Sequence, residues 1–189
     1  MKDQKIIIIT APSGSGKSTL TKLLMAAFPQ LAFSISACTR SPRAGETDGV
    51  DYHFISVPAF EKAIAAREFI EWEMVYEGKY YGTLKTELNR IWDRRQVPLV
   101  DIDVKGALNV QQQYPGHHLS VFIQAPSLSI LKERLEKRGT ETAETLAERI
   151  GKAEYELSFA QEFDHIVVND DLARASEQLI GIVGDYLNN

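Results

Sequence analysis

The residues best suited to chemistry form a short glycine-rich loop that ends in a lysine and two hydroxyl residues. The loop matches the pattern G-x-x-x-x-G-K-[ST] at Gly16, Lys17 and Ser18, with Ala11 at the position of the first glycine. In such a loop backbone N–H groups face a phosphate, the lysine reaches the β- and γ-phosphates, and the hydroxyl can bind Mg²⁺. The whole segment comprises Ala11, Pro12, Ser13, Gly14, Ser15, Gly16, Lys17, Ser18 and Thr19.

Two interpretations of this loop are open, because a glycine- and serine-rich turn can also merely cap a helix. The loop directly follows an apolar strand pattern and directly precedes a helical one, which favours a nucleoside triphosphate site. Ala11 is compatible with that site if its φ is negative, since only a positive φ demands glycine.

A second candidate site is the loop that carries Arg40 and Arg43. The two arginines are three residues apart with Pro42 between them, and they could converge on one phosphate. Tyr52 and Tyr81 could each add a hydroxyl donor. The alternative is a solvated basic loop, which is the usual meaning of scattered arginines.

A pair of carboxylates, Asp101 and Asp103, lies at the end of one of the apolar strand patterns. Side chains alternate along a strand, so these two share one face. Sites in open parallel sheets lie at the carboxyl ends of the strands, where both would then be found. The alternative is an ordinary polar strand end.

Composition limits the classes of protein that can hold these residues. The chain has 189 residues, of which 44% are hydrophobic and 25% charged, as in one globular domain with a sizeable core. One cysteine, Cys38, excludes an internal disulfide, and we interpret it as a small filler in a reducing compartment. A formal net charge of −5 argues against nucleic-acid and membrane partners. The N-terminal apolar stretch, 6–11, is too short for a signal or a membrane helix, so we expect a cytoplasmic protein.

The elements that must position the candidate residues alternate between strand and helix. Near-continuous apolar runs predict buried parallel strands, and helical patterns lie between or after them. This alternation predicts an α/β fold of the P-loop type, with a parallel sheet of five strands or a similar number. The predicted strands are 5–10, 97–104, 119–125 and 165–168, and the predicted helices are 17–28, 104–113, 127–137 and 172–187.

Two segments break this alternation. Residues 33–87 predict a small mixed insertion, and residues 134–156 are dense in charge and predict a mobile helical lid. The core of the single domain would then comprise 1–32, 88–133 and 157–189. The strand patterns of the insertion are 33–36, 52–56, 69–75 and 79–81, around a short helix at 58–66.

Taken together, the motifs resemble those of the guanylate kinase family, the P-loop kinases that phosphorylate GMP. The resemblance includes Thr39-Arg40-Ser41-Pro42-Arg43 and spans nearly the whole chain in the order of the family. Ala11 and Cys38 depart from the family pattern, but neither position holds a charge that the reaction needs. The matching segments are 11–18, 36–46, 68–72, 80–83, 99–103, 134–140 and 168–171.

The resemblance implies roles for residues in the insertion and beside it. Arg40, Arg43, Tyr52 and Tyr81 match the family's contacts to the phosphate of GMP. The family's contacts to the guanine base are matched by Ser36, Glu71, Thr83 and Asp103. The chemistry agrees, because a carboxylate such as Glu71 can accept from both N1–H and the 2-amino group of guanine.

It also implies roles on the ATP side. The ATP-binding set is Ala11, Pro12, Ser13, Gly14, Ser15, Gly16, Lys17, Ser18, Thr19, Arg134, Arg138 and Asn169, with Asn169 near the adenine. Mg²⁺ would contact Ser18 directly and Asp101 through water. The catalytic residues would be Lys17, Arg40, Arg43, Arg138 and Arg149.

The implied activity is ATP + GMP (or dGMP) → ADP + GDP (or dGDP), a step of purine nucleotide metabolism. The alternatives are a related kinase with another phosphorylated acceptor and a non-catalytic module of the same fold. Such modules typically lose the phosphate-loop residues, whereas Lys17 and Ser18 are present here. The implied partners are the nucleotides alone, and the chain could be a monomer or a homo-oligomer.

Overall fold

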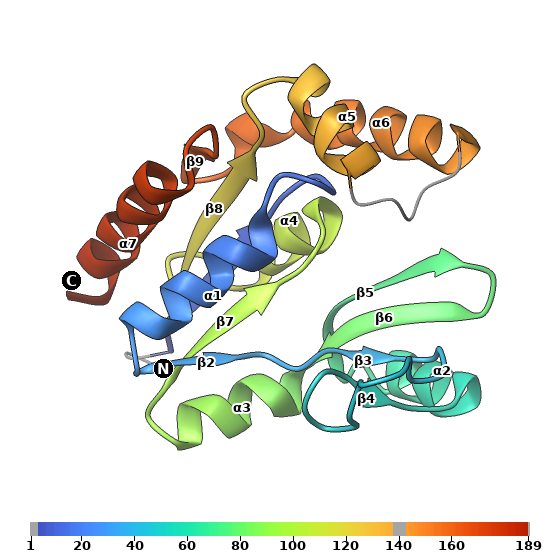
Figure 1. Cartoon of the computed structure of the whole chain (residues 1–189). Helices are drawn as coiled ribbons and strands as arrows, with labels where there is room; N and C mark the ends of the chain where they lie inside the picture. Colours follow the sequence, from blue (N-terminus) through green and yellow to red (C-terminus); the bar gives the residue numbers. More distant parts are fainter. Residues whose placement is uncertain (1–3, 138–142, 189) are drawn as a thin grey trace.

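Five parallel strands form the central sheet of the computed structural model, which describes residues 4–137 and 143–188. The strand order is β2-β7-β1-β8-β9 (Figure 1). Ile9 pairs with Asp101 and Thr10 with Phe122, so that three strands end at the same edge. The predicted α/β fold with a five-stranded parallel sheet is therefore confirmed. The strands are β1 (Ile6–Thr10), β2 (Leu31–Phe33), β7 (Val97–Asp101), β8 (His118–Gln124) and β9 (His165–Val168).

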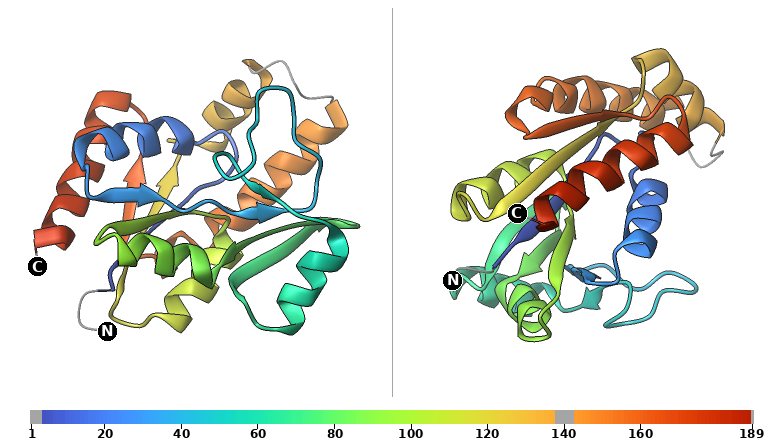
Figure 2. Two further views of the ribbon diagram at one scale, coloured as in Figure 1. Left: turned by 90° about the horizontal axis from the view of Figure 1, so that it is seen from below. Right: turned by 90° about the vertical axis from the view of Figure 1, so that its left-hand side faces the viewer.

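Helices cover both faces of this sheet because its strands are apolar on both sides. Ile6 and Ile8 point to one face while Ile7 and Ile9 point to the other, and all four are fully buried. Helices α1 (Lys17–Ala27) and α7 (Leu172–Asn188) run side by side on the Ile7 and Ile9 face (Figure 2). Helices α3 (Lys85–Asp93) and α4 (Val104–Gln113) cover the opposite face. None of the helices in the described ranges combines the length and the apolar character needed to cross a membrane.

A second, small sheet has the strand order β4-β3-β6-β5 and lies beside the central sheet (Figure 1). It is held together by helix α2 (Val57–Ala65), whose buried Phe60 stacks on Phe69 with ring centroids 4.3 Å apart. The antiparallel pair β5 and β6 places Glu71 opposite Thr83. The strands are β3 (Ala37–Cys38), β4 (His53–Phe54), β5 (Phe69–Tyr76) and β6 (Lys79–Leu84).

Two helices, α5 (Leu128–Lys137) and α6 (Ala143–Leu157), lie opposite the small sheet (Figure 1). A small apolar cluster that includes Leu131, Leu135 and Ala153 holds the two helices together. A 3₁₀ turn (Ala160–Glu162) leads from α6 to β9. Within the predicted lid segment, residues 134–137 and 143–156 are thus helical, and α6 packs on α5.

The structure corrects the prediction for residues 33–36 and adds elements that the sequence did not indicate. The strand runs over Leu31–Phe33 and pairs in parallel with β7, so it belongs to the central sheet and not to the insertion. The buried Leu31 opposite Val97 decides this pairing. Helix α3 and the two-residue strand β3 were not predicted, because neither carries a long periodic pattern.

We expect Phe60→Ala to loosen the small sheet while leaving the central sheet folded. Removing a fully buried Phe costs about 3–5 kcal/mol, and this ring packs on β5 and β6 rather than on the central sheet. Hydrogen exchange should show lost protection over β3 to β6 and retained protection in β1, β7 and β8. Phe33→Ala, at a side chain that is 39% exposed, is the control. Uniform loss of protection would contradict this account.

Candidate active site

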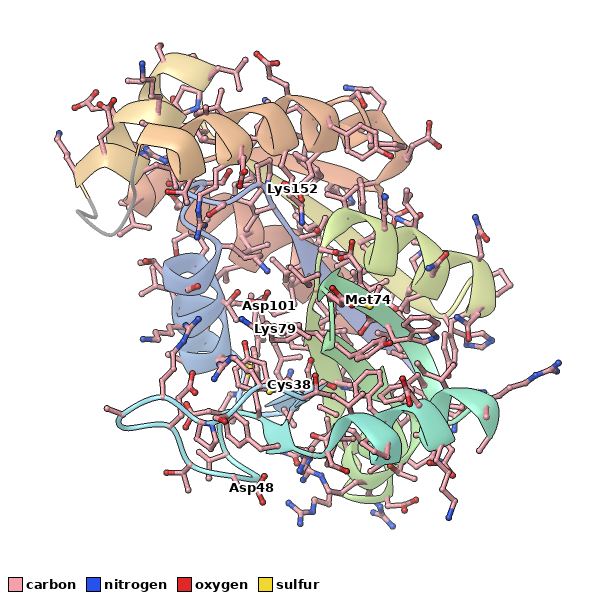
Figure 3. All side chains as sticks on the ribbon, turned by 90° about the vertical axis from the view of Figure 1, so that its right-hand side faces the viewer. Cys38, Asp48, Met74, Lys79, Asp101 and Lys152 are labelled. Carbon is pink, nitrogen blue, oxygen red and sulfur yellow. The ribbon has the colours of Figure 1, made fainter. Side chains whose placement is uncertain are left out.

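A cavity of about 660 Å³ opens at the carboxyl ends of β1 and β7. The glycine-rich loop (residues 11–19), the small sheet and α6 form its walls, and Asp101 is seen between Lys152 of α6 and Cys38 of the small sheet in Figure 3. The structure therefore brings together most of the residues predicted from the sequence. Those that line the cavity are Ala11, Pro12, Ser13, Gly14, Gly16, Lys17, Ser18, Thr19, Ser36, Tyr52, Glu71, Tyr81, Asp101, Asp103 and Arg149.

The glycine-rich loop has the backbone that phosphate binding requires. Gly14 and Gly16 adopt φ values of 92° and 91°, in the left-handed region that favours glycine. Ala11 is not among the residues with positive φ, which meets the condition set by the sequence. Gly16 precedes the first turn of α1, and no described side chain caps that end. The first N–H groups of α1 therefore remain available to an anion.

Side chains from distant segments support this loop. The buried Asn169 donates from Nδ2 to the carbonyl of Ser15 at 2.8 Å, and Arg134 donates to the carbonyl of Asn169 at 2.9 Å. Arg149 of α6 donates to the Ser13 hydroxyl at 2.9 Å. Arg138 lies outside the described residues. Asn169 thus contacts the loop and Arg134 contacts Asn169, and neither is among the residues that line the cavity.

Lys17 and Asp101 form an ion pair on the floor of the site. Burial lowers the pKa of Lys17 to about 8, although the charges of Asp103 and Glu156 oppose this shift. Ser18 lies beside the pair and lines, with Lys17 and Asp101, an adjoining cavity of about 530 Å³. A lysine that has lost part of its water is stabilised by an anion beside it, and the Asp101 carboxylate fills that place.

The oxygen donors of Ser18 and Asp101 fit a magnesium ion that is bound mainly by substrate. Within the described ranges, no group of three or more His, Cys, Asp or Glu residues could hold a metal ion by itself. Mg²⁺ prefers oxygen ligands and usually takes only one or two from the protein, with substrate phosphates and water completing its shell. The Ser18 hydroxyl and the Asp101 carboxylate agree with this preference.

Arg40, which the sequence predicted to contact a phosphate, is held by residues of its own loop and of the small sheet. Glu46 accepts from both ends of its guanidinium, at 2.5 and 2.7 Å, and the Tyr81 hydroxyl accepts from Nε at 3.1 Å. The Tyr52 ring packs 5.0 Å from the guanidinium carbon. Arg40 in turn holds the pKa of Glu46 at about 2. The Arg43 side chain is exposed, and its backbone N–H donates to Glu46 at 2.8 Å.

Sequence reasoning missed Glu46, although a signal was available. It follows Arg43 by three residues and Arg40 by six in the same loop. A carboxylate so close to two arginines is a natural partner for them.

The buried carboxylate of Glu71, on β5, lies in the part of the cavity wall that the small sheet forms. Glu71 is 8% exposed and accepts hydrogen bonds from the side chain and backbone of Thr83, which is fully buried. Burial raises the pKa of Glu71 to about 7, against an ordinary value of 4.5. The hydroxyls of Thr83 and Ser36 are 3.5 Å apart, and Ser36 can donate to Thr83, whose own hydroxyl hydrogen is directed to Glu71. Carboxylate and hydroxyl groups thus gather in one wall of the cavity, as predicted.

Asp103 is both a helix cap and part of a carboxyl pair. It accepts from the Gly106 N–H at 2.8 Å, at the start of α4. Glu73 hydrogen-bonds to Asp103, and this bond together with burial raises the pKa of Glu73 to about 7. Glu73 was not predicted, although it lies two residues after Glu71 and so on the same strand face. Lys152 and Glu156 of α6 also line the cavity and were missed, although Arg149 of the same helix was predicted.

A parallel sheet whose first strand runs through a glycine-rich loop into a helix defines the P-loop class of nucleotide-binding proteins. The structure is similar to the crystal structure of a guanylate kinase from Anaplasma phagocytophilum, with a TM-score of 0.75 and 27% identity over 96% of this chain and 85% of that one.

The sequence comparisons define the family more narrowly. The family model described as guanylate kinase matches residues 3–186. The chain is 45% identical to a guanylate kinase of Bacteroides fragilis, over 98% of this chain and 91% of the relative. It is 44% identical to a guanylate kinase of Salinibacter ruber, over the full length of both chains. The chain therefore belongs to the guanylate kinase family, as the resemblance of its motifs predicted.

The raised pKa of Glu71 predicts how stability depends on pH. Between pH 4.5 and 7 the folded chain keeps a proton that the unfolded chain loses, so the free energy of unfolding should fall as pH rises through that window. Glu71→Gln should reduce the fall in the free energy of unfolding across this window by on the order of 3 kcal/mol. Denaturant titrations at several pH values measure it, with Glu61→Gln, exposed on α2, as the control. An unchanged pH dependence in Glu71→Gln would contradict the assignment.

Proposed function

We propose that this chain transfers the γ-phosphoryl group of ATP to GMP or dGMP, with ADP and GDP or dGDP as products. One observation carries the proposal: a single cavity joins the glycine-rich loop, with Lys17, to the buried carboxylate of Glu71. This arrangement supports a phosphate site that opens directly onto a site for a base with two N–H donors. Membership of the guanylate kinase family supports the same reaction.

On the donor side, the ATP phosphates would bind the amides of the glycine-rich loop and the uncapped start of α1. Lys17 would leave Asp101 for the β- and γ-phosphates, which would keep it protonated despite its burial. Mg²⁺, held by Ser18 and through water by Asp101, would neutralise phosphate charge. Asn169 would support the donor site through its contact with the loop, and Arg134 would do so through its bond to Asn169.

On the acceptor side, the phosphate of GMP would take the place of Glu46 beside Arg40. Glu46 now occupies both ends of that guanidinium, and a phosphate offers the same paired acceptors. The hydroxyls of Tyr52 and Tyr81 would complete the site together with Arg43, whose exposed side chain is free to turn inwards. The ordered Arg40 would thus meet the substrate in a prepared position.

Base selection would depend mainly on Glu71. An ionised Glu71 accepts from N1–H and the 2-amino group of guanine, and these two donors would lower its pKa from about 7. Ser36, Thr83 and Asp103 would complete the polar wall. Adenine presents a lone pair at N1, which a carboxylate would repel.

The transfer itself needs no covalent intermediate with the protein. Phosphoryl transfer of this kind rests on positioning and on cations around the migrating group. Lys17, Arg40, Arg43 and Arg149 would surround that group, together with Arg138. The hydrogen bond from Arg149 to Ser13 supports the proposal that residues 134–156 act as a lid, which closes on the loop and excludes water. A reducing cytoplasm suits the buried Cys38 thiol.

An assay of ADP release with ATP, Mg²⁺ and a panel of acceptors tests this function. GMP and dGMP should turn over, and AMP, CMP and UMP should be slower by at least about 10²-fold in kcat/KM. Lys17→Ala should lower kcat by about 10²–10³-fold with the fold intact, whereas Lys22→Ala, exposed on α1, should not. A Lys17→Ala variant that kept more than about a tenth of kcat would exclude this loop as the catalytic one. Nucleotide binding without any turnover would favour the non-catalytic module.

Glu71→Gln tests the base site separately. The amide keeps the volume but turns a donor towards a donor of guanine, so kcat/KM for GMP should fall by roughly 10²–10³-fold. IMP lacks the 2-amino group and should lose less, while the KM for ATP should stay unchanged. Steady-state kinetics with both acceptors measure this, with Glu61→Gln as the control. Equal losses for GMP and IMP would make Glu71 a structural carboxylate.

A further inference from the structure

Gly106 lies in the first turn of α4, where that helix packs against β5 and the carboxylate of Glu71. A Cβ added at Gly106 would lie 2.8 Å from Glu71 Oε2 and 3.3 Å from Glu71 Cδ. It would also lie 3.1 Å from Asp103 Oδ1. No ordinary Cβ approaches an oxygen as closely as 2.8 Å, so any side chain here would require Glu71 to move.

The backbone gives no other reason for glycine at this position. Gly106 is not among the residues with positive φ, and it lies within the helix Val104–Gln113. Alanine is the better helix former at such a position. The feature that requires glycine is therefore the space taken by the Glu71 carboxylate.

The opposite side of that carboxylate is held as well. Thr83 donates to Glu71 from its side chain and from its backbone N–H. Thr83 is fully buried, and its strand β6 pairs with β5 at Glu71. Glu71 thus stands between β6 and the first turn of α4, and these two contacts set the direction of its oxygens.

We propose that Gly106 is a positioning residue for base selection, because its missing side chain lets the Glu71 carboxylate settle against α4 and face the acceptor base in one orientation. The inference rests on the proposed function, in which Glu71 accepts from guanine. Gly106 itself touches no reacting atom. A methyl group there would displace the Glu71 carboxylate and misalign both of its acceptor oxygens.

Gly106→Ala tests this in steady-state kinetics with GMP, IMP and ATP. A misplacement of about 1 Å can cost up to 10²-fold, so kcat/KM for GMP should fall by about 10–10²-fold. The ratio of kcat/KM for GMP to that for IMP should fall towards the value of Glu71→Gln, while the KM for ATP should stay within about twofold, a pattern that general loosening of the fold would not produce. Gly181→Ala is the matched control, because Gly181 lies in α7 and an added Cβ there meets no atom within 4 Å. An unchanged GMP to IMP ratio in Gly106→Ala would overturn the inference.

The double variant Gly106→Ala/Glu71→Ala shows whether Gly106 acts through Glu71. With the carboxylate gone the new methyl group has space, so the substitution at Gly106 should change kcat/KM for GMP by less than about twofold. The same loss in both backgrounds would overturn the inference. If Gly106→Ala does not fold, the double variant should fold, and failure of both would equally overturn it.

The single variant Glu71→Ala separates the two proposals. If it leaves the ratio of GMP to IMP unchanged, the proposed role of Glu71 fails and the inference about Gly106 fails with it. If Glu71→Ala lowers that ratio while Gly106→Ala does not, only the inference about Gly106 fails.

Discussion

The parallel pairing of β1 with β7 is the constraint on which the rest of the site depends. Ile9 lies opposite Asp101, so the loop that follows β1 and the carboxylate that ends β7 meet at one edge of the sheet. Lys17 then reaches Asp101 across 84 positions of sequence. A slip of one residue would exchange the buried faces of β1 and carry Asp101 away from Lys17. Burial of four consecutive isoleucines against helices on both faces stabilises β1 in the middle of the sheet.

A second theme is that the protein supplies carboxylate partners for its own anion-binding cations. Asp101 pairs with Lys17, and Glu46 pairs with Arg40. Cations that have lost part of their water would be costly to leave unpaired, so these carboxylates keep them ordered. In the proposed reaction, substrate phosphates replace Asp101 beside Lys17 and Glu46 beside Arg40. Binding then exchanges one anion for another at cations that are already oriented.

The sequence predicted the parts of the fold that carry long or continuous patterns. Strands β1, β7, β8 and β9 and helices α1, α4 and α7 were all expected, because near-continuous apolar strands and helical periodicity are local signals. Residues 33–36 were misassigned because a strand of three residues carries too little pattern to reveal its partner. Leu31 joins β7 only because the folded chain provides an open edge beside Val97.

The site divides in the same way. The glycine-rich loop and Arg40 could be found from residue types and spacing, and Glu71 was found through the resemblance of its segment to a known family. The contacts that hold these groups in place could not be found from the sequence. Asn169 supports Ser15 from 154 positions away, Glu73 meets Asp103 from a different sheet, and Gly106 makes room for Glu71. The sequence determined which groups are present, while their partners and orientations were decided by the tertiary structure, because only packing brings distant backbone and side chains within contact distance.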